Sequence, residues 1–96
     1  SDFINHSCDP NAGLADAITL IAIKDILKDD EILSDYAFWE SDANWAMKND
    51  CLCGSMQCRK KITGQDWEKI TSTDAKFKYF SPFLQRRIIK NETKEP

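Results

Sequence analysis

The chain of 96 residues lacks any apolar run long enough to cross a bilayer, so we expect no membrane-spanning segment. It has no basic stretch followed by an apolar one near its start, and nothing in it directs secretion. Internal repeats and low-complexity segments are also absent. The basic residues form no stripe interleaved with aromatic residues, and we therefore expect no direct binding of nucleic acid.

Methionine is missing from the first position, which Ser1 occupies, and we expect the chain to be a fragment of a longer protein. Its composition, 42% hydrophobic and 30% charged, is that of one globular domain or part of one. Residues 1–50 hold eleven acidic and three basic residues, whereas residues 51–96 hold five acidic and ten basic residues. The acidic first half suits a basic partner, although a solvated surface explains it equally well.

Two stretches favour β-structure. Residues 17–23 are almost all apolar or β-branched and predict a strand buried on both faces. Residues 31–36 predict a second, shorter strand after a turn at Asp29. We expect a loop with a helical turn over residues 37–50 and a short helix over residues 65–70. The expected fold class is therefore mainly β with short helices and loops.

The clearest helix is predicted over about residues 82–90. Ser81 is a suitable N-cap, and Pro82 is suited to the first helical position. Residues 91–96 are expected to be a frayed tail. Four apolar side chains fall on one face at helical spacing: Phe83, Leu84, Ile88 and Ile89.

The opening stretch, residues 3–11, contains the only histidine, His6, together with Cys8 and two asparagines. Asn, Ser, Asp and Pro favour turns, while Phe3 and Ile4 can anchor the segment in a core. We therefore expect a tight loop that holds polar side chains at fixed positions, as binding sites often do.

Three of the four cysteines, Cys51, Cys53 and Cys58, form a C-x-C-x4-C cluster. Clustered cysteines in a chain without a leader favour metal ligands over disulfides. Zinc takes four ligands, and the fourth must come from elsewhere, with Cys8 and His6 as candidates. We prefer a zinc site made by the four cysteines. Two disulfides or four free thiols are the alternatives.

Tyr36 follows Asp35 at the end of the second predicted strand. A tyrosine hydroxyl is neutral at physiological pH, can donate or accept a hydrogen bond, and can position an amine. Tyrosines at strand ends are more often structural, so the interest of Tyr36 depends on its neighbours.

Together these pieces resemble the SET-domain lysine methyltransferases over roughly residues 1–64. Residues 3–11 are similar to the asparagine-histidine motif of that family. Residues 22–36, with the pair Asp35 and Tyr36 at their end, resemble its second motif. Residues 51–59 resemble its post-SET zinc segment.

The resemblance implies a partial SET-type β-fold with a pseudoknot, in which a later segment threads the opening loop. It also implies three parts of the chain. Residues 1–50 would be the C-terminal half of the SET domain, residues 51–64 the post-SET zinc segment, and residues 65–96 a C-terminal extension with the helix.

The resemblance also implies roles for single residues. Asn5 and His6 would contact S-adenosylmethionine, with Leu52 near its adenine, and Tyr36 would be the catalytic tyrosine. The implied activity is transfer of a methyl group to a lysine amine of a basic, histone-like protein. The implied zinc ligands are the four cysteines preferred above: Cys8, Cys51, Cys53 and Cys58.

The sequence departs from the family in several places. The first half of the family's domain, with its cofactor-binding strand, is not in this chain, so we expect the 96 residues to be inactive alone. A homodimer or intertwined assembly could complete the sheet. Asp2 stands where a basic residue is frequent, and Asp29 where a turn glycine is usual. Ser34 replaces the usual aromatic residue; it leaves room, could bind water, and favours higher methylation states.

The alternative to an enzyme is a non-catalytic SET-like, zinc-containing module that binds protein. The four clustered thiols favour an intracellular, reducing location. A nuclear, chromatin-bound protein is expected in a eukaryote. A bacterial cytoplasmic protein, or an effector delivered into a host, is the alternative setting.

Overall fold

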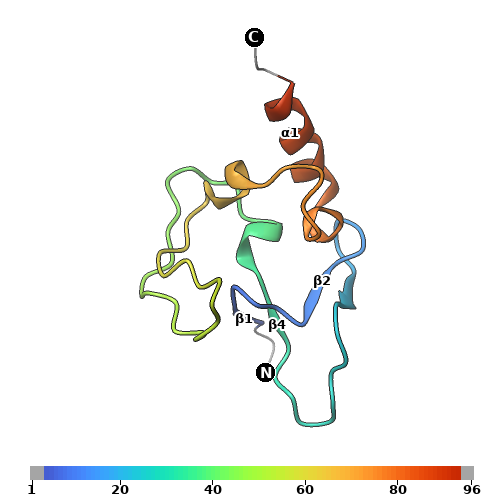
Figure 1. The fold of residues 1–96 in the computed structure, drawn as a ribbon, viewed down its shortest axis with the longest axis vertical. Helices are drawn as coiled ribbons and strands as arrows, with labels where there is room; N and C mark the ends of the chain where they lie inside the picture. The colour runs from blue at the N-terminus through green and yellow to red at the C-terminus, as the bar shows by residue number, and fades with distance from the viewer. Residues whose placement is uncertain (1–3, 94–96) are drawn as a thin grey trace.

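The computed structural model describes residues 4–93. Within them, regular structure consists of a four-stranded sheet, short 3-10 helices and one α-helix (Figure 1). The expected fold class, mainly β with short helices and loops, is therefore confirmed. The expectations for Asp2 and Phe3, and for the end of the tail at residues 94–96, lie outside the described residues.

The sheet has the strand order β1-β4-β2-β3, so the last strand in sequence lies between the first two. Strand β4 runs parallel to both β1 and β2, whereas β2 and β3 are antiparallel. The strands are short: β1 is Asn5–His6, β2 is Ala12–Leu14, β3 is Leu20–Ala22 and β4 is Leu33–Ser34.

The loop between β1 and β2 closes around β4. The Ser7 amide donates to the Ser34 carbonyl at 3.0 Å, and the Asn11 amide donates to the Leu33 carbonyl at 3.0 Å. Both ends of the opening loop are therefore fastened to the same later strand. This arrangement brings His6 next to the residues that follow β4.

The prediction of a strand buried on both faces over residues 17–23 is wrong. All three residues of β3, Leu20–Ala22, are exposed, because β3 is an edge strand that pairs only with β2. A tight turn precedes it, in which the Asp16 carboxylate accepts hydrogen bonds from the Ile18 and Thr19 amides at 2.9 Å. That turn uses the first residues of the predicted strand.

The second predicted strand, residues 31–36, is shorter than expected because Asp35 ends it. Asp35 is the N-cap of the 3-10 helix η1, Tyr36–Phe38, and its carboxylate accepts the Ala37 amide at 2.9 Å. Capping of a helical turn by a short acidic side chain competes with extended structure. Tyr36 therefore begins a helical turn rather than ending a strand.

Two backbone positions need unusual conformations or space. Asp29 has a φ of 76°, so the prediction that it takes the turn position of a glycine is confirmed. Gly13 lies in β2, and a Cβ added there would lie 2.6 Å from the Cβ of Tyr79. Glycine therefore allows the 3-10 helix η3, Phe77–Tyr79, to pack closely on the sheet.

The cysteine-rich segment is a loop closed by backbone hydrogen bonds. The Met47 amide donates to the Ile62 carbonyl at 2.8 Å, and the Cys51 amide donates to the Lys60 carbonyl at 2.7 Å. In Figure 1 this segment, drawn in yellow-green, lies beside β1. The closed loop holds the cysteines against the opening stretch.

The helix α1, Pro82–Glu92, confirms the predicted C-terminal helix. The Ser81 side chain caps it by accepting the Leu84 amide at 3.2 Å. Leu84 and Ile88 are buried, and burial of each contributes about 1.5–3 kcal/mol. Only two of the four side chains of the predicted apolar face pack into the core, since the other two stay exposed: Phe83 at 53% and Ile89 at 47%.

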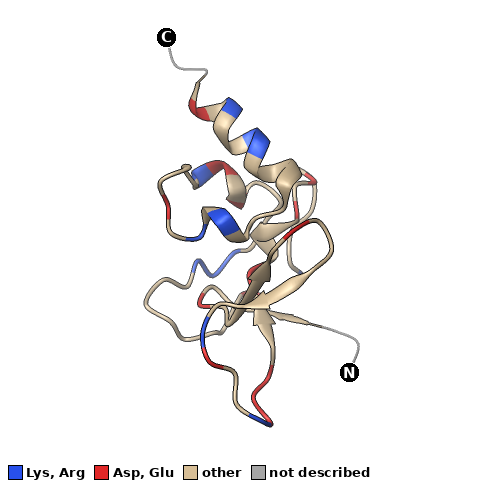
Figure 2. Ribbon diagram, turned by 90° about the vertical axis from the view of Figure 1, so that its right-hand side faces the viewer, with Lys and Arg blue, Asp and Glu red and all other residues tan. Residues whose placement is uncertain are grey.

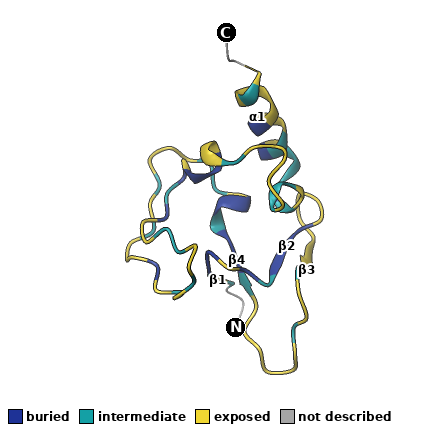
Figure 3. Ribbon diagram, viewed as in Figure 1, coloured by how far each residue is buried: buried dark blue, intermediate teal, exposed yellow. Residues whose placement is uncertain are grey.

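Helix α1 completes a small core above the sheet. The short helix predicted near residues 65–70 is the 3-10 helix η2, Asp66–Lys69, which contacts α1. Figure 3 shows the buried positions gathered along β2, η1 and the inner side of α1.

Figure 2 shows Lys and Arg positions on α1 and charges of both signs on the loop that joins β3 to β4. No described helix is long and apolar enough to span a membrane.

Candidate functional site

The four cysteines come together although 43 positions separate Cys8 from Cys51. Their Sγ atoms all lie within 4.8 Å of one another, and those of Cys8 and Cys51 are 4.0 Å apart. Cys8 and Cys51 are buried, while Cys53 and Cys58 are half-buried. None of the four is in a disulfide. The group can therefore offer four sulfur atoms to a single metal ion.

The spacing of the cluster is explained by a tight turn of the backbone. Gly54 has a φ of 75°, a conformation that favours glycine, and it directly follows Cys53. The Cys58 amide then donates to the Ser55 carbonyl at 3.2 Å. This turn brings Cys58 back to the side of the loop on which Cys51 lies.

His6 contacts the cysteine group as a hydrogen-bond donor. Its Nδ1 accepts the Tyr36 amide at 3.1 Å, so the neutral ring carries its proton on Nε2. Nε2 lies 3.4 Å from the Sγ of Cys8. The imidazole is 1% exposed, and burial holds the pKa of His6 below its usual 6.5, which keeps the ring neutral. Of the two candidates for the fourth ligand, the structure therefore favours Cys8.

The surroundings of the sulfur atoms differ. Burial raises the pKa of the Cys8 thiol to about 12, whereas hydrogen bonds with Ser55 lower the pKa of Cys53 to about 5. The Arg59 amide donates to the Sγ of Cys8 at 3.3 Å, and Lys76 Nζ donates to the Cys8 carbonyl at 2.9 Å. The hydrogen bond and the charge of Arg59 favour the thiolate form of Cys8, which is the form that binds metal, but burial outweighs them.

Tyr36 lies among aromatic rings and also packs against the buried group of Cys8, Cys51 and Ile62. The ring centroids of His6, Trp39 and Trp45 are 5.1, 5.7 and 6.1 Å from that of Tyr36. The Tyr36 hydroxyl donates to the Ile4 carbonyl at 2.8 Å. A hydroxyl that donates in this way keeps its lone pairs, which can accept a hydrogen bond from an incoming amine.

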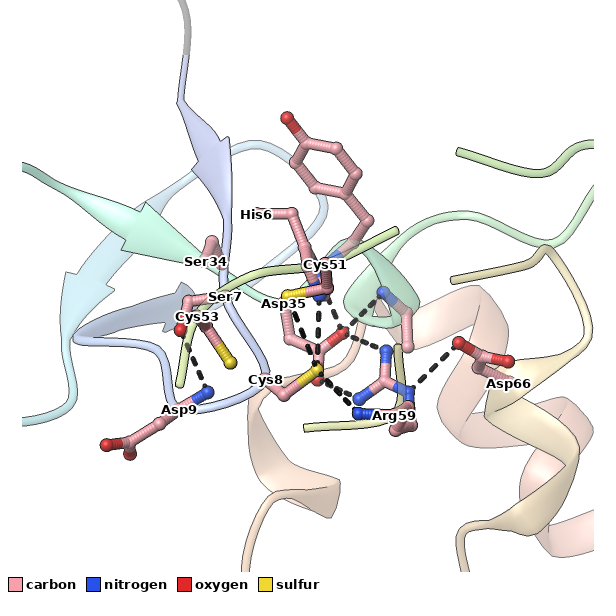
Figure 4. Close-up of polar contacts among 12 residues, drawn as sticks. His6, Ser7, Cys8, Asp9, Ser34, Asp35, Cys51, Cys53, Arg59 and Asp66 are labelled. Atoms are coloured by element: carbon pink, nitrogen blue, oxygen red, sulfur yellow. Dashed lines mark hydrogen bonds and ion pairs between the residues drawn. The ribbon is translucent and has the colours of Figure 1, made fainter. Parts of the chain in front are cut away.

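A buried ion pair joins the cysteine-rich segment to the residue before Tyr36. The Arg59 guanidinium donates to both carboxylate oxygens of Asp35, at 2.8 and 2.9 Å, and to Asp66 at 3.0 Å (Figure 4). Asp35 is 3% exposed. Burial alone would raise the pKa of Asp35, but the hydrogen bonds and charge of Arg59 outweigh it and hold that pKa below its usual value.

The three residues expected to bind cofactor have different surroundings. His6 lies inside, between Cys8 and Tyr36. Asn5 is exposed, and its amide donates to the Glu31 carboxylate. Leu52 is 87% exposed. The structure thus brings His6, Tyr36 and the four cysteines together and leaves Asn5 and Leu52 at the surface.

Ser34 differs from its expected role. It is fully buried, and its hydroxyl donates to the Ala12 carbonyl at 2.8 Å. The sheet already uses this hydroxyl, so the expectation of a free group that binds water beside Tyr36 is wrong. Its small side chain fits between β4 and β2.

Sequence reasoning missed two residues that organise the site. The Asn11 side chain accepts the Leu33 amide at 2.9 Å and donates to the Glu31 carbonyl at 2.8 Å, which holds the start of β4. Arg59 holds Asp35. The only signal for either residue was its position inside a recognised motif, because the local sequence does not indicate partners that lie 20 or more residues away.

Comparison with known proteins places the first part of the chain. Residues 1–37 match the SET domain family model. The chain is 42% identical over 76 residues to the histone-lysine N-methyltransferase, H3 lysine-9 specific, dim-5 of Neurospora crassa, with 59% of the chain covered. It is 39% identical over 67 residues, again 59% of the chain, to the H3 lysine-4 specific enzyme of Emericella nidulans. No solved structure matches the chain.

A third relative matches nearly the whole chain. The histone-lysine N-methyltransferase ASHH3 of Arabidopsis thaliana is 28% identical over 97 residues, which cover 94% of the chain. The chain spans 23%, 5% and 26% of the lengths of the Neurospora, Emericella and Arabidopsis proteins. The chain is therefore similar to a SET domain over residues 1–37 and to histone-lysine N-methyltransferases over more of its length.

Proposed function

We propose that this chain is part of a protein-lysine N-methyltransferase that moves a methyl group from S-adenosylmethionine to a lysine amine. The observation that carries the proposal is the position of Tyr36. It lies within the SET-matched residues 1–37, beside His6, with a hydroxyl whose lone pairs can meet an amine. The names of the three relatives support the same reaction class.

In this proposal Tyr36 positions the amine that reacts. The Ile4 carbonyl fixes the hydroxyl at 2.8 Å, so its oxygen can accept an amine N–H in one direction. Proper orientation of two reactants can supply much of the acceleration of a displacement reaction. Bound S-adenosylmethionine would supply the methyl group from its sulfonium, which becomes a neutral thioether when the methyl group leaves.

The aromatic neighbours would help to keep the amine neutral. The rings of Trp39 and Trp45 lie beside that of Tyr36, and the half-buried Trp45 also packs against the buried group of Cys8, Cys51 and Ile62. An apolar surrounding disfavours the charged form of a lysine and lowers its pKa. A neutral amine has the lone pair that the reaction needs.

The residues fit zinc. In a tetrahedral site with Zn–S distances of about 2.3 Å, sulfur atoms lie about 3.8 Å apart. The four Sγ atoms lie within 4.8 Å of one another, with Cys8 and Cys51 at 4.0 Å, so a small contraction produces that geometry. We therefore assign a structural zinc to these ligands: Cys8, Cys51, Cys53 and Cys58.

Only part of a cofactor site can be assigned to this chain. The exposed Asn5 amide could meet polar groups of S-adenosylmethionine, and the exposed Leu52 could cover its adenine. His6 would hold the loop that carries Asn5. The remaining contacts would come from a part of the domain that this chain does not contain, so the 96 residues alone should not turn over. Self-association, as a homodimer or intertwined pair, could complete the sheet.

The proposed substrate is a basic, histone-like protein in chromatin. Its lysine-rich segments would approach an acidic first half of the chain, which has eleven acidic and three basic residues. We propose that residues 1–50 are the C-terminal half of a SET domain, residues 51–64 a post-SET zinc-binding segment and residues 65–96 a C-terminal extension that contains the helix. Because Ser34 is buried in the sheet, we propose no methylation state from it.

The test uses the complete protein that contains this chain. Binding of S-adenosylmethionine is measured by calorimetry, and transfer of its labelled methyl group to histone H3 is followed by mass spectrometry. Cofactor binding with methylated lysine supports the proposal. Absence of both would contradict it and favour the non-catalytic, zinc-containing binding module. The same assay on the 96 residues should give no product, and robust turnover there would refute the expected inactivity.

A further inference from the structure

The sulfur of Cys8 receives two hydrogen bonds from residues far apart in sequence. His6 Nε2 lies 3.4 Å from it, and the backbone amide of Arg59 lies 3.3 Å from it. Both donors are fixed by other contacts. The imidazole is buried, and the Arg59 guanidinium is held by Asp35 and Asp66.

The far ends of the same two residues meet at the start of η1. His6 Nδ1 accepts the backbone amide of Tyr36 at 3.1 Å. The Arg59 guanidinium holds Asp35, whose carboxylate caps η1 through the Ala37 amide at 2.9 Å. His6 and Asp35 also approach each other to 3.8 Å. One bridge therefore ends on the backbone of Tyr36, and the other ends on the residues that flank it.

We propose that His6 and Arg59 are positioning residues that couple metal occupancy at the four cysteines to the position of Tyr36. The inference rests on the proposed zinc centre and deepens it. A metal held by four sulfurs fixes the Cys8 sulfur in space. Through two short bridges, that sulfur then fixes the backbone of η1 and with it the direction of the Tyr36 ring.

The geometry gives the arginine bridge a property that can be tested separately from metal binding. Arg59 contacts Cys8 through its backbone amide but Asp35 through its side chain. Replacement of the side chain should therefore keep the contact with the sulfur and break the contacts with Asp35 and Asp66. A residue that merely stabilised the fold would show no such separation.

The experiment follows the backbone amide signals of Tyr36 and Ala37 by NMR while zinc is added to the 96-residue chain. The variants are Arg59→Gln and His6→Phe, with Arg86→Gln as the matched control on the exposed side of α1. Zinc bound per chain is measured on the same samples. We expect one zinc in each protein and a clearly smaller zinc-induced shift at Tyr36 in each bridge variant. The two decreases should not add, because His6 and Asp35 approach each other to 3.8 Å.

A further variant, Arg59→Lys, tests the fork geometry of the arginine. This change keeps the charge, but an ammonium cannot donate in parallel to both oxygens of Asp35, so it should restore only part of the shift. If Arg59→Gln does not fold, the double variant Asp35→Asn with Arg59→Met removes both charges of the pair, while the Asp66 carboxylate keeps its hydrogen bonds from Thr63. A shift like that of the wild type in this double variant overturns the proposal.

The outcomes are distinct. Zinc bound with an undiminished Tyr36 shift in Arg59→Gln and His6→Phe overturns the coupling and leaves the zinc centre in place. A wild-type chain that binds no zinc overturns both. Absence of methyl transfer by the complete protein bears only on the proposed activity, because neither readout here depends on turnover.

Discussion

Arg59 holds Asp35 in a two-pronged ion pair, with its two terminal nitrogens 2.8 and 2.9 Å from the two carboxylate oxygens. The partners are 24 residues apart, and Asp35 is almost fully buried. One member directly follows Cys58 and the other directly precedes Tyr36. This contact joins the cysteine group and the candidate catalytic tyrosine into one unit.

The first prediction concerns the stability of that unit. Arg59→Ala should lower the free energy of unfolding by about 3–5 kcal/mol, because it leaves the carboxylate of Asp35 buried without its partner. Unfolding in urea, followed by tryptophan fluorescence, measures the loss. Arg86→Ala, on the exposed side of α1, should change stability by less than about 0.5 kcal/mol. Equal effects of the two changes would show that the buried pair contributes little.

The second prediction concerns acid. The pKa of Asp35 is lowered in the fold from its usual 3.8, so its contribution is fully present above that pH and is lost as pH falls through its folded value. The wild type should therefore lose more stability in acid than Asp35→Asn, which cannot titrate there. Urea unfolding in zinc-free buffer at about pH 5 and about pH 2 tests this.

The control for the acid experiment is Asp25→Asn, which changes an exposed carboxylate in the loop before β4. Its acid dependence should match that of the wild type. A constant difference between wild type and Asp35→Asn across the acid range would contradict the assignment, because it would mean that Asp35 titrates alike in the folded and unfolded chains.

Local signals in the sequence predicted some elements well. Ser81 and Pro82 predicted the start of α1, and the helix begins at Pro82. Such signals can be recognised in the sequence because a cap and a first-turn proline act on neighbouring residues. Asp29 took the expected left-handed turn. The C-x-C-x4-C spacing predicted a loop whose cysteines converge, and they do, with Cys8 as the fourth member.

The failures share a physical cause. Residues 17–23 were predicted to form a buried strand because their side chains are apolar. Burial, however, depends on whether other elements cover the strand, and β3 is an exposed edge strand of the sheet. The strands β1 and β2 are too short to have a period. The partners of Arg59, Asn11 and His6 are fixed by strand order, which brings β4 between β1 and β2, and no local pattern encodes that order.

The third prediction separates two roles within the opening loop. Cys8→Ser should lose zinc and loosen the C-terminal segment, because it removes one of the four sulfurs. Asn5→Ala should keep zinc and weaken cofactor binding by the complete protein, because its exposed amide donates to the Glu31 carboxylate and is not one of the four sulfur ligands. Zinc per chain and the dissociation constant of S-adenosylmethionine are the measurements. The same loss in both variants would mean that the loop acts as one structural unit.

The role of Tyr36 is tested most directly by methyl transfer in the complete protein. Tyr36→Phe removes only the hydroxyl that donates to Ile4, and Tyr79→Phe makes the same change at a tyrosine that packs on Gly13. We predict that Tyr36→Phe lowers the rate of methyl transfer by about 100-fold or more with zinc content unchanged, while Tyr79→Phe stays near the wild type. Methyl transfer near the wild-type rate in folded, zinc-loaded Tyr36→Phe would contradict the catalytic assignment.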